Sequence, residues 1–268
     1  MISLSKLQQY KAEGTRFSCL TCYDATLAKA MEVAQIDTIL IGDSLGMTIQ
    51  GHDSTLPVTV EDMAYHTRAV RRGNQHALII TDLPFMSYST LNDAICSARQ
   101  VMQAGAQMVK IEGGAWLADT VRALAQGGIP SCVHLGLTPQ SVNVFGGYKV
   151  QAKTRSAADQ LLADCEAVVE AGAVMLLLEC VPVKAAQEVQ ARFGVPVIGI
   201  GAGSYCDGQV LVVQDMLGLN FGKSARFVRN FLQGQQGENP IVDAFKSFHQ
   251  AVRSGEYPAP EHSFQIEL

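Results

Sequence analysis

Short apolar runs alternate with amphipathic segments along most of the chain. The runs are nearly continuous and rich in Val, Ile and Leu, which is typical of strands in a parallel sheet covered on both faces. The amphipathic segments begin at capping residues such as Asp24, Thr59 and Thr90, and they predict helices. Strands are therefore expected at residues 17–21, 38–43, 77–82, 109–112, 131–135, 173–179, 195–201 and 209–213.

Eight strand–helix units in 268 residues match a (β/α)8 barrel, which takes on the order of 250 residues. We predict a single-domain α/β TIM barrel over residues 1–268, with an N-terminal helix and extra C-terminal helices. A doubly wound open sheet is the alternative, but the glycines at 199–203 follow a late strand and lack the spacing of a dinucleotide-binding fingerprint. The other helices are expected at 24–35, 59–73, 90–105, 115–126, from Ser156, at 183–193 and after Gly222.

Two segments of the chain repeat one another without a gap. Residues 104–112 and 171–179 both run from a helix end through a turn and a strand to a glutamate. Two copies are too few for a solenoid, whereas the corresponding units of a barrel repeat in this way.

Polar residues end five of the expected strands. In a barrel the carboxyl ends of the strands converge on one mouth, where such enzymes keep their chemistry. A single acidic residue there is more often a helix cap or a turn residue, but five together indicate a functional site. These residues are Asp43, Asp82, Glu112, His134 and Glu179, with Lys110 one layer below them.

Lys110 and Glu112 interrupt the apolar pattern of their strand. Their spacing of two residues places both side chains on one face, while Val109 and Ile111 point to the other face. A buried structural ion pair is the alternative interpretation. The polar ends of the other strands favour a functional site.

Three carboxylates at one mouth would repel one another unless a cation lay among them. Oxygen ligands without a matching His/Cys cluster favour magnesium over zinc. Magnesium usually leaves some of its coordination positions to water or substrate, so the keto and carboxylate oxygens of a 2-oxoacid can bind to it. As a Lewis acid, the ion then makes the proton on the carbon next to the ketone more acidic.

That carbon requires a base to take its proton. Glu179 ends a strand otherwise built of Leu and Met, where loss of solvent makes a carboxylate a stronger base. Its alternative role is to pair with His134 or Lys110. Lys110 is suited to stabilise a developing enolate or a substrate carboxylate, and Ser44 is suited to donate to a substrate oxygen or to a local partner.

Composition narrows the class of protein. With 48% hydrophobic residues the chain can bury a large core, and a net charge of -5 gives no electrostatic reason to bind nucleic acid or an anionic membrane. The seven cysteines are scattered, and Cys19 and Cys22 would face opposite sides of a strand, so neither a disulfide framework nor a metal pair is expected. The N-terminus lacks a signal-peptide pattern, and a cytoplasmic protein is expected.

Several segments resemble the ketopantoate hydroxymethyltransferase family. The likeness extends from Ile2 to Phe264, and several of its motifs are long enough to be specific. The motifs are GDSLGM at 42–47, QGHDSTLPV at 50–58, VKIEGG at 109–114, HLGLTPQS at 134–141, FGGYKVQ at 145–151 and GIGAG at 199–203.

The resemblance implies transfer of a one-carbon unit from 5,10-methylenetetrahydrofolate to 3-methyl-2-oxobutanoate, which gives 2-dehydropantoate for pantothenate synthesis. The family is similar to the phosphoenolpyruvate mutase and isocitrate lyase barrels, and it implies a cytoplasmic homo-oligomer, commonly a decamer. Matched by position, the implied roles are Mg2+ binding for Asp43, Asp82 and Glu112, 2-oxoacid binding for Asp43, Ser44, Asp82 and Lys110, and catalysis for Glu179, Lys110 and His134.

Two alternatives to this function stay open. One is a magnesium-dependent carbon–carbon lyase or phosphomutase on the same barrel, although Gly113 and Gly114 stand where an isocitrate-type lyase has a cysteine motif. The other is a non-catalytic oxyacid-binding protein.

The chain departs from the family pattern at Ala152, where a glycine is common. The glycine-containing loop from Gly136 to Gln151 is a hypothetical lid over the mouth of the barrel.

Overall fold

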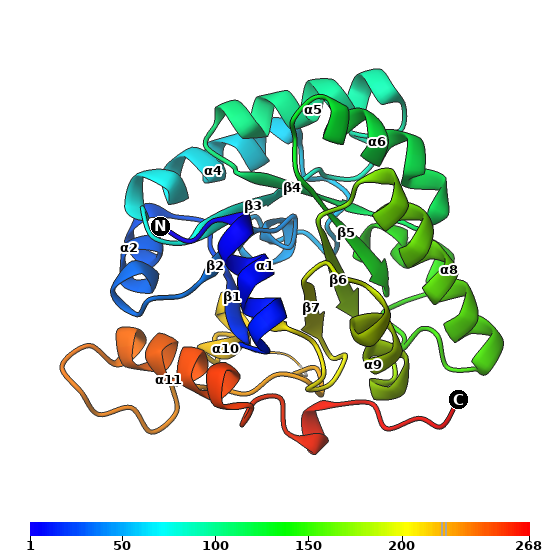
Figure 1. The fold of residues 1–268 in the computed structure, drawn as a ribbon. Helices are drawn as coiled ribbons and strands as arrows, with labels where there is room; N and C mark the ends of the chain where they lie inside the picture. Colours follow the sequence, from blue (N-terminus) through cyan, green and yellow to red (C-terminus); the bar gives the residue numbers. More distant parts are fainter. Residues whose placement is uncertain (221, 223) are drawn as a thin grey trace.

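The computed structural model describes residues 1–220, 222 and 224–268. Eight parallel strands close into a barrel in chain order, and the last strand pairs with the first (Figure 1). The prediction of a (β/α)8 barrel is therefore confirmed. The strands are β1 (Phe17–Thr21), β2 (Thr38–Ile41), β3 (Leu78–Asp82), β4 (Met108–Glu112), β5 (Ser131–Gly136), β6 (Met175–Glu179), β7 (Val197–Ile200) and β8 (Gly208–Leu211).

Long helices cover the outside of the barrel (Figure 1). The sequence predicts their starts well because most begin at a Ser, Thr or Asp whose side chain accepts a hydrogen bond from the first turn. Thr59 and Asp62 form a reciprocal capping box at the start of α4. The long helices are α1 (Leu4–Glu13), α2 (Ala25–Val33), α4 (Val60–Gly73), α5 (Leu91–Gln103), α6 (Ala118–Gln126), α8 (Arg155–Ala171), α9 (Val183–Arg192) and α11 (Pro240–Ser254).

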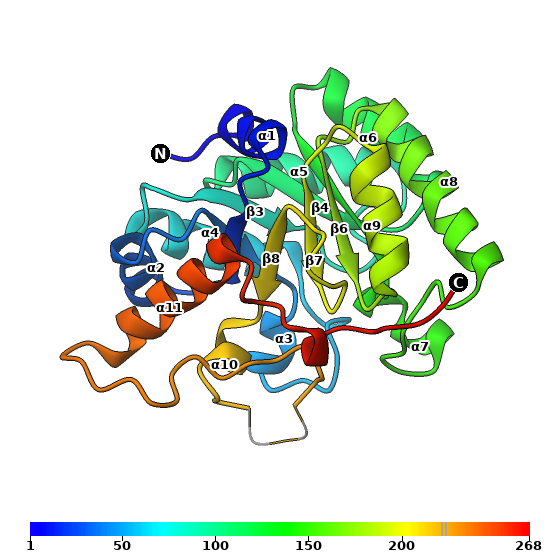
Figure 2. The same cartoon turned by 60° about the horizontal axis from the view of Figure 1, so that its bottom comes forward.

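The two ends of the barrel are covered differently. Helix α1 lies at the amino-terminal ends of the strands, where Nζ of Lys11 lies 2.9 Å from Oδ2 of Asp207. Short helices lie at the opposite end (Figure 2). They are α3 (Leu45–Thr48), α7 (Val142–Phe145) and α10 (Val213–Met216), with 3-10 turns η1 (Ala115–Leu117), η2 (Pro139–Ser141) and η3 (Pro260–His262) elsewhere in the chain.

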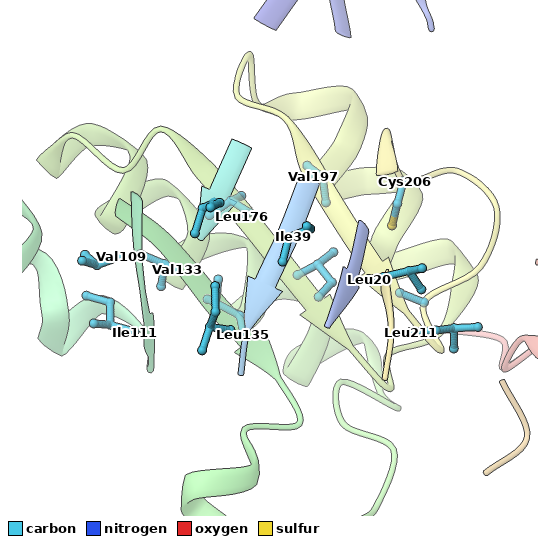
Figure 3. Packing of buried hydrophobic residues seen from close by; sticks show 14 of the residues in the cluster. Leu20, Ile39, Val109, Ile111, Val133, Leu135, Leu176, Val197, Cys206 and Leu211 are labelled. Carbon is cyan, nitrogen blue, oxygen red and sulfur yellow. The ribbon is translucent and has the colours of Figure 1, made fainter. Parts of the chain in front are cut away.

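Alternate residues of each strand point into two different environments. Val109 and Ile111 belong to the apolar layer between strands and helices (Figure 3), whereas Lys110 and Glu112 face the inside of the barrel. Cys19 likewise lies inside the barrel and Cys22 lies in the outer layer. The period of two that was predicted for β4 is therefore present.

Several predicted boundaries differ from the structure. The strand expected at 209–213 ends at Leu211, and Val213 begins α10. The strand expected from Val195 begins at Val197, because Pro196 has no N–H to donate. The helix expected from Ala115 begins with a 3-10 turn, and the helix expected from Ser156 begins at Arg155 with Thr154 as its cap.

The segment expected as a long loop after β5 contains η2 and α7. The segment after Gly222 contains α11 and η3, in agreement with the prediction of C-terminal helices. In the described part of the chain, no helix combines the length and apolar character needed to cross a bilayer.

Candidate active site

The residues predicted from the strand ends come together in one place. A cavity of about 870 Å³ opens at the carboxyl ends of the strands. Its wall includes every residue singled out from the sequence, namely Asp43, Ser44, Asp82, Lys110, Glu112, His134 and Glu179.

Lys110 lies at the centre of a buried ionic network. Strand pairing places Asp82 directly beside it, and Nζ of Lys110 lies 2.8 Å from Oδ1 of Asp82 and 3.4 Å from Oε1 of Glu112. Burial lowers the pKa of Lys110, but the charges of Asp82, Glu112 and Asp43 outweigh it and raise that pKa above its usual value. The ammonium is therefore held in its charged form inside the barrel.

Glu112 is the most firmly ionised carboxylate of the network. Burial raises its pKa, but the charges of Lys110 and His134 and hydrogen bonds to the carboxylate lower it to about 2. Its Oε1 lies 3.2 Å from Nδ1 of His134, and its Oε2 accepts a hydrogen bond of 3.0 Å from the backbone N–H of Gln140. Both carboxylate oxygens are thus engaged by the protein.

His134 connects the buried network to Glu179. Its Nε2 lies 3.3 Å from Oε2 of Glu179, at ion-pair distance and without the alignment of a hydrogen bond. Burial lowers the pKa of His134, but the charge of Glu112 and contacts with Glu112 and Glu179 raise it to about 9. The pairing of Glu179 with His134, foreseen as an alternative role, is present, and the Glu179 side chain still retains 14% exposure.

Asp43 carries the least compensated charge. Burial, followed by the charges of Asp82 and Glu112, raises the pKa of Asp43 well above its usual range. Burial also raises the pKa of Asp82, although Lys110 opposes this shift. The backbone N–H of Asp43 donates to Oδ2 of Asp82 over 3.1 Å, so the two carboxyl groups are neighbours.

This arrangement fits one further cation. In the residues that the structure describes, no set of three or more Asp, Glu, His or Cys side chains is positioned to hold an ion together. Magnesium commonly takes one or two carboxylates and keeps water for the rest, so Asp43 and Asp82 suffice as a pair. A cation there would offset the burial and the repulsion by Asp82 and Glu112 that together raise the pKa of Asp43.

Ser44 makes the local bond foreseen as its alternative role. Its Oγ lies 2.8 Å from Oη of Tyr23, and it also lines the cavity.

Sequence reasoning missed Gln140 and Tyr88. Both are buried in connecting segments after strands, Gln140 in η2 and Tyr88 in a loop, where no periodicity indicates which side chains point inward. The signal available was the position of Gln140 inside the 134–141 motif. The outer wall of the cavity, with Tyr148, Phe227 and Phe264, was not predicted either.

The barrel of this chain is similar to those of several solved structures. It resembles the solved structure of phosphonopyruvate hydrolase in complex with oxalate and Mg2+, with a TM-score of 0.61 and 13% identity over 79% of this chain and 81% of that chain. It also resembles 2,3-dimethylmalate lyase, a member of the phosphoenolpyruvate mutase/isocitrate lyase superfamily, with a TM-score of 0.59 and 16% identity over 79% and 81%. At these identities the likeness establishes the fold.

Sequence comparison defines the family. Residues 1–260 match the ketopantoate hydroxymethyltransferase family. The 3-methyl-2-oxobutanoate hydroxymethyltransferase of Acinetobacter baumannii (strain AYE) is 73% identical over the full length of both chains, and that of Psychrobacter sp. (strain PRwf-1) is 60% identical over 98% of this chain and all of the relative. The chain belongs to the ketopantoate hydroxymethyltransferase family, and the prediction of a hydroxymethyltransferase enzyme is confirmed.

Proposed function

We propose that the chain transfers a hydroxymethyl group from 5,10-methylenetetrahydrofolate to 3-methyl-2-oxobutanoate and so forms 2-dehydropantoate, the first step of pantothenate biosynthesis. The observation that carries this proposal is the single cavity that joins a partly exposed carboxylate, Glu179, to the buried Lys110 network. A base beside a buried, charged ammonium group is the arrangement that proton abstraction next to a ketone requires.

Each of four cavity residues has a proposed role in substrate binding or proton transfer. Lys110 and Ser44 bind oxygens of the 2-oxoacid, and Glu179 accepts the proton from C3. His134 lies between Glu179 and Glu112 and holds the base in place. Loss of the C3 proton leaves an electron pair that forms the new carbon–carbon bond to the methylene carbon of the folate, and Lys110 stabilises the charge that develops on the keto oxygen. Both carbon–nitrogen bonds of that methylene group break, and water supplies the hydroxyl group of the product. Tetrahydrofolate leaves with the proton taken from C3 and one proton of the water on its nitrogens.

The neighbouring carboxylates of Asp43 and Asp82 would hold Mg2+. Glu112, which contacts Lys110, would add a further negative charge near the ion. When bound, the ion supplies a Lewis acid that polarises the keto group of the substrate. The raised pKa of Asp43 supports a cation at this point.

The size of the cavity supports a second, larger substrate. Its volume of about 870 Å³ lies in the upper part of the roughly 300–1,000 Å³ range of sites for drug-sized ligands, well above the needs of a five-carbon acid. Tyr148, Phe227 and Phe264 line its outer part and offer apolar surface to a reduced folate.

The test is an assay of the purified chain with 3-methyl-2-oxobutanoate, 5,10-methylenetetrahydrofolate and Mg2+, with the product identified by mass spectrometry. We expect 2-dehydropantoate to form and its formation to stop when EDTA removes the metal. Absence of product with magnesium present would contradict the proposed reaction.

We propose a homo-oligomer, a decamer, in the cytoplasm. Large exposed apolar side chains in the loop after β3, in α5 and in η1 support association, because such side chains are commonly covered by a partner. Light scattering should give a mass near ten times 28.8 kDa, and a monomer mass would contradict this proposal. The exposed residues are Phe85, Met86, Leu91, Ile95 and Trp116.

A further inference from the structure

We infer that Gln140 is a positioning residue that sets the orientation of the Asp43 and Glu112 carboxylates, and that Tyr88 stabilises the orientation of the Gln140 amide. The inference concerns the site of the proposed function and rests on the proposal that this site binds Mg2+.

Gln140 is buried and contacts two carboxylates at once. Its side-chain Nε2 donates to Oδ2 of Asp43 over 2.8 Å, and its backbone N–H donates to Oε2 of Glu112 over 3.0 Å. One residue of η2 therefore links acidic groups that follow β2 and end β4. The two groups cannot rotate independently while these bonds persist.

The amide of Gln140 has only one orientation that satisfies its neighbours. Nε2 faces two acceptors, Oδ2 of Asp43 and the backbone oxygen of Leu83, which lies 3.0 Å away. The amide oxygen faces the hydroxyl of Tyr88 at 2.5 Å, and that hydroxyl is a donor. A flipped amide would set its oxygen against the Asp43 carboxylate and the Leu83 carbonyl, so these two acceptors select the observed orientation. The Tyr88 hydroxyl stabilises that orientation by donating to the amide oxygen.

An amide suits this task better than a charged group. Lys110 already neutralises part of the network, and a second buried cation would compete with the proposed metal for Asp43. The neutral amide directs one oxygen of Asp43 and leaves the negative charge in place. Outer residues of this kind typically change metal affinity by about 10–100-fold when they are lost.

The main variant is Gln140→Met, which keeps the length of the side chain and the backbone N–H to Glu112 and removes the amide. Gln209→Met is the matched control, because Gln209 is a buried glutamine whose Nε2 donates to the backbone oxygen of Gly203 over 3.0 Å, outside the cavity wall. Tyr88→Phe is the milder second variant, since the ring keeps its stacking on Trp116. Each is measured by calorimetric titration with MgCl2 in the absence of substrate, by thermal unfolding, and by the Mg2+ dependence of turnover.

We expect Gln140→Met to weaken Mg2+ binding by about 10–100-fold and to recover much of its turnover at high Mg2+ concentration. Tyr88→Phe should shift Mg2+ binding in the same direction by a smaller factor, and Gln209→Met should bind Mg2+ as the wild type does while losing comparable thermal stability. Unchanged Mg2+ affinity in Gln140→Met, or in Tyr88→Phe if the first variant does not fold, would overturn the inference. An equal loss in Gln209→Met would do the same.

The wild-type titration separates this inference from the proposed function. A wild-type chain that binds no Mg2+ contradicts the metal site itself. A wild-type chain that binds Mg2+ and a Gln140→Met variant that binds it equally well contradicts only the role of Gln140.

Discussion

Nε2 of His134 lies 3.3 Å from Oε2 of Glu179, and the strands that carry them, β5 and β6, pair in the barrel. The other ring nitrogen of His134 lies 3.2 Å from Glu112. The pKa of His134 is raised to about 9, so the ring is cationic at neutral pH and favours the anionic form of Glu112. Glu179, the proposed base, therefore contacts the buried network through His134, while its own side chain stays partly exposed.

Glu179→Gln keeps the shape of the side chain and removes the proposed base. We expect exchange of the C3 proton of 3-methyl-2-oxobutanoate to slow by about 10²–10⁴-fold, while the affinity for the 2-oxoacid changes little. Exchange is followed by NMR in deuterated solvent, and affinity by calorimetry. Loss of affinity in step with exchange would remove the role of Glu179 as the base.

Glu112→Ala removes the anion that faces both Lys110 and His134. Two buried cations then lose a partner, and we expect the affinities for Mg2+ and for the 2-oxoacid to fall together by at least about tenfold. Calorimetric titration of each ligand measures this. Retention of either affinity at the wild-type level would contradict the shared network.

Gly136→Ala tests how β5 positions Glu179. Gly136 has φ +88, and a Cβ added there would come within 2.5 Å of the backbone oxygen of Glu179. We expect a loss of about 1 kcal/mol or more in the free energy of unfolding, together with slower C3 exchange. Gly14→Ala is the control, because Gly14 also has positive φ but its added Cβ meets nothing within 4 Å. The control should lose stability only, and loss of exchange in both variants would argue against a local effect on Glu179.

Ala152→Gly tests the departure from the family pattern. Ala152 adopts φ +51, a left-handed conformation that glycine adopts without steric cost. We expect the substitution to raise the free energy of unfolding by up to about 1 kcal/mol. Ala191→Gly in α9, where the backbone is helical, should lower it by up to about 1 kcal/mol. Chemical denaturation measures both, and the same sign in both variants would contradict strain at Ala152.

The segment from Gly136 to Gln151 is predicted to close over the cavity. Tyr148 and Val150 line the cavity from this segment, while Val144 in α7 is exposed. We expect hydrogen exchange of the segment to slow when Mg2+ and the 2-oxoacid bind, with α11 as the internal control. Equal exchange with and without ligands would exclude a lid.

The sequence predicted the parts of the structure that repeat. Continuous apolar runs identified all eight strands, and the period of two in β4 correctly assigned Lys110 and Glu112 to one face, which is the inner face of the barrel. The gathering of strand-end residues followed from barrel geometry alone. The residues themselves suggested a divalent metal, an oxyacid and Glu179 as the base, whereas the assignment of individual ligands and the named substrates came from the family resemblance.

The site residues that the sequence did not predict lie in segments without the regular side-chain period of a strand or a long helix. Gln140 reaches the site from η2 and Tyr88 from a loop, and their contacts depend on tertiary structure that no local pattern encodes. The ends of β7 and β8 were misplaced by two residues because Pro196 and Val212 are as apolar in sequence as the strands they adjoin.

The most direct test of the account is deuterium exchange at C3 of 3-methyl-2-oxobutanoate, catalysed by the wild-type chain in the absence of folate. The account predicts exchange that requires Mg2+ and is faster than in buffer, because Glu179 and the Lys110 network act before the one-carbon unit arrives. A chain that binds the 2-oxoacid with Mg2+ and leaves the C3 proton in place would contradict it.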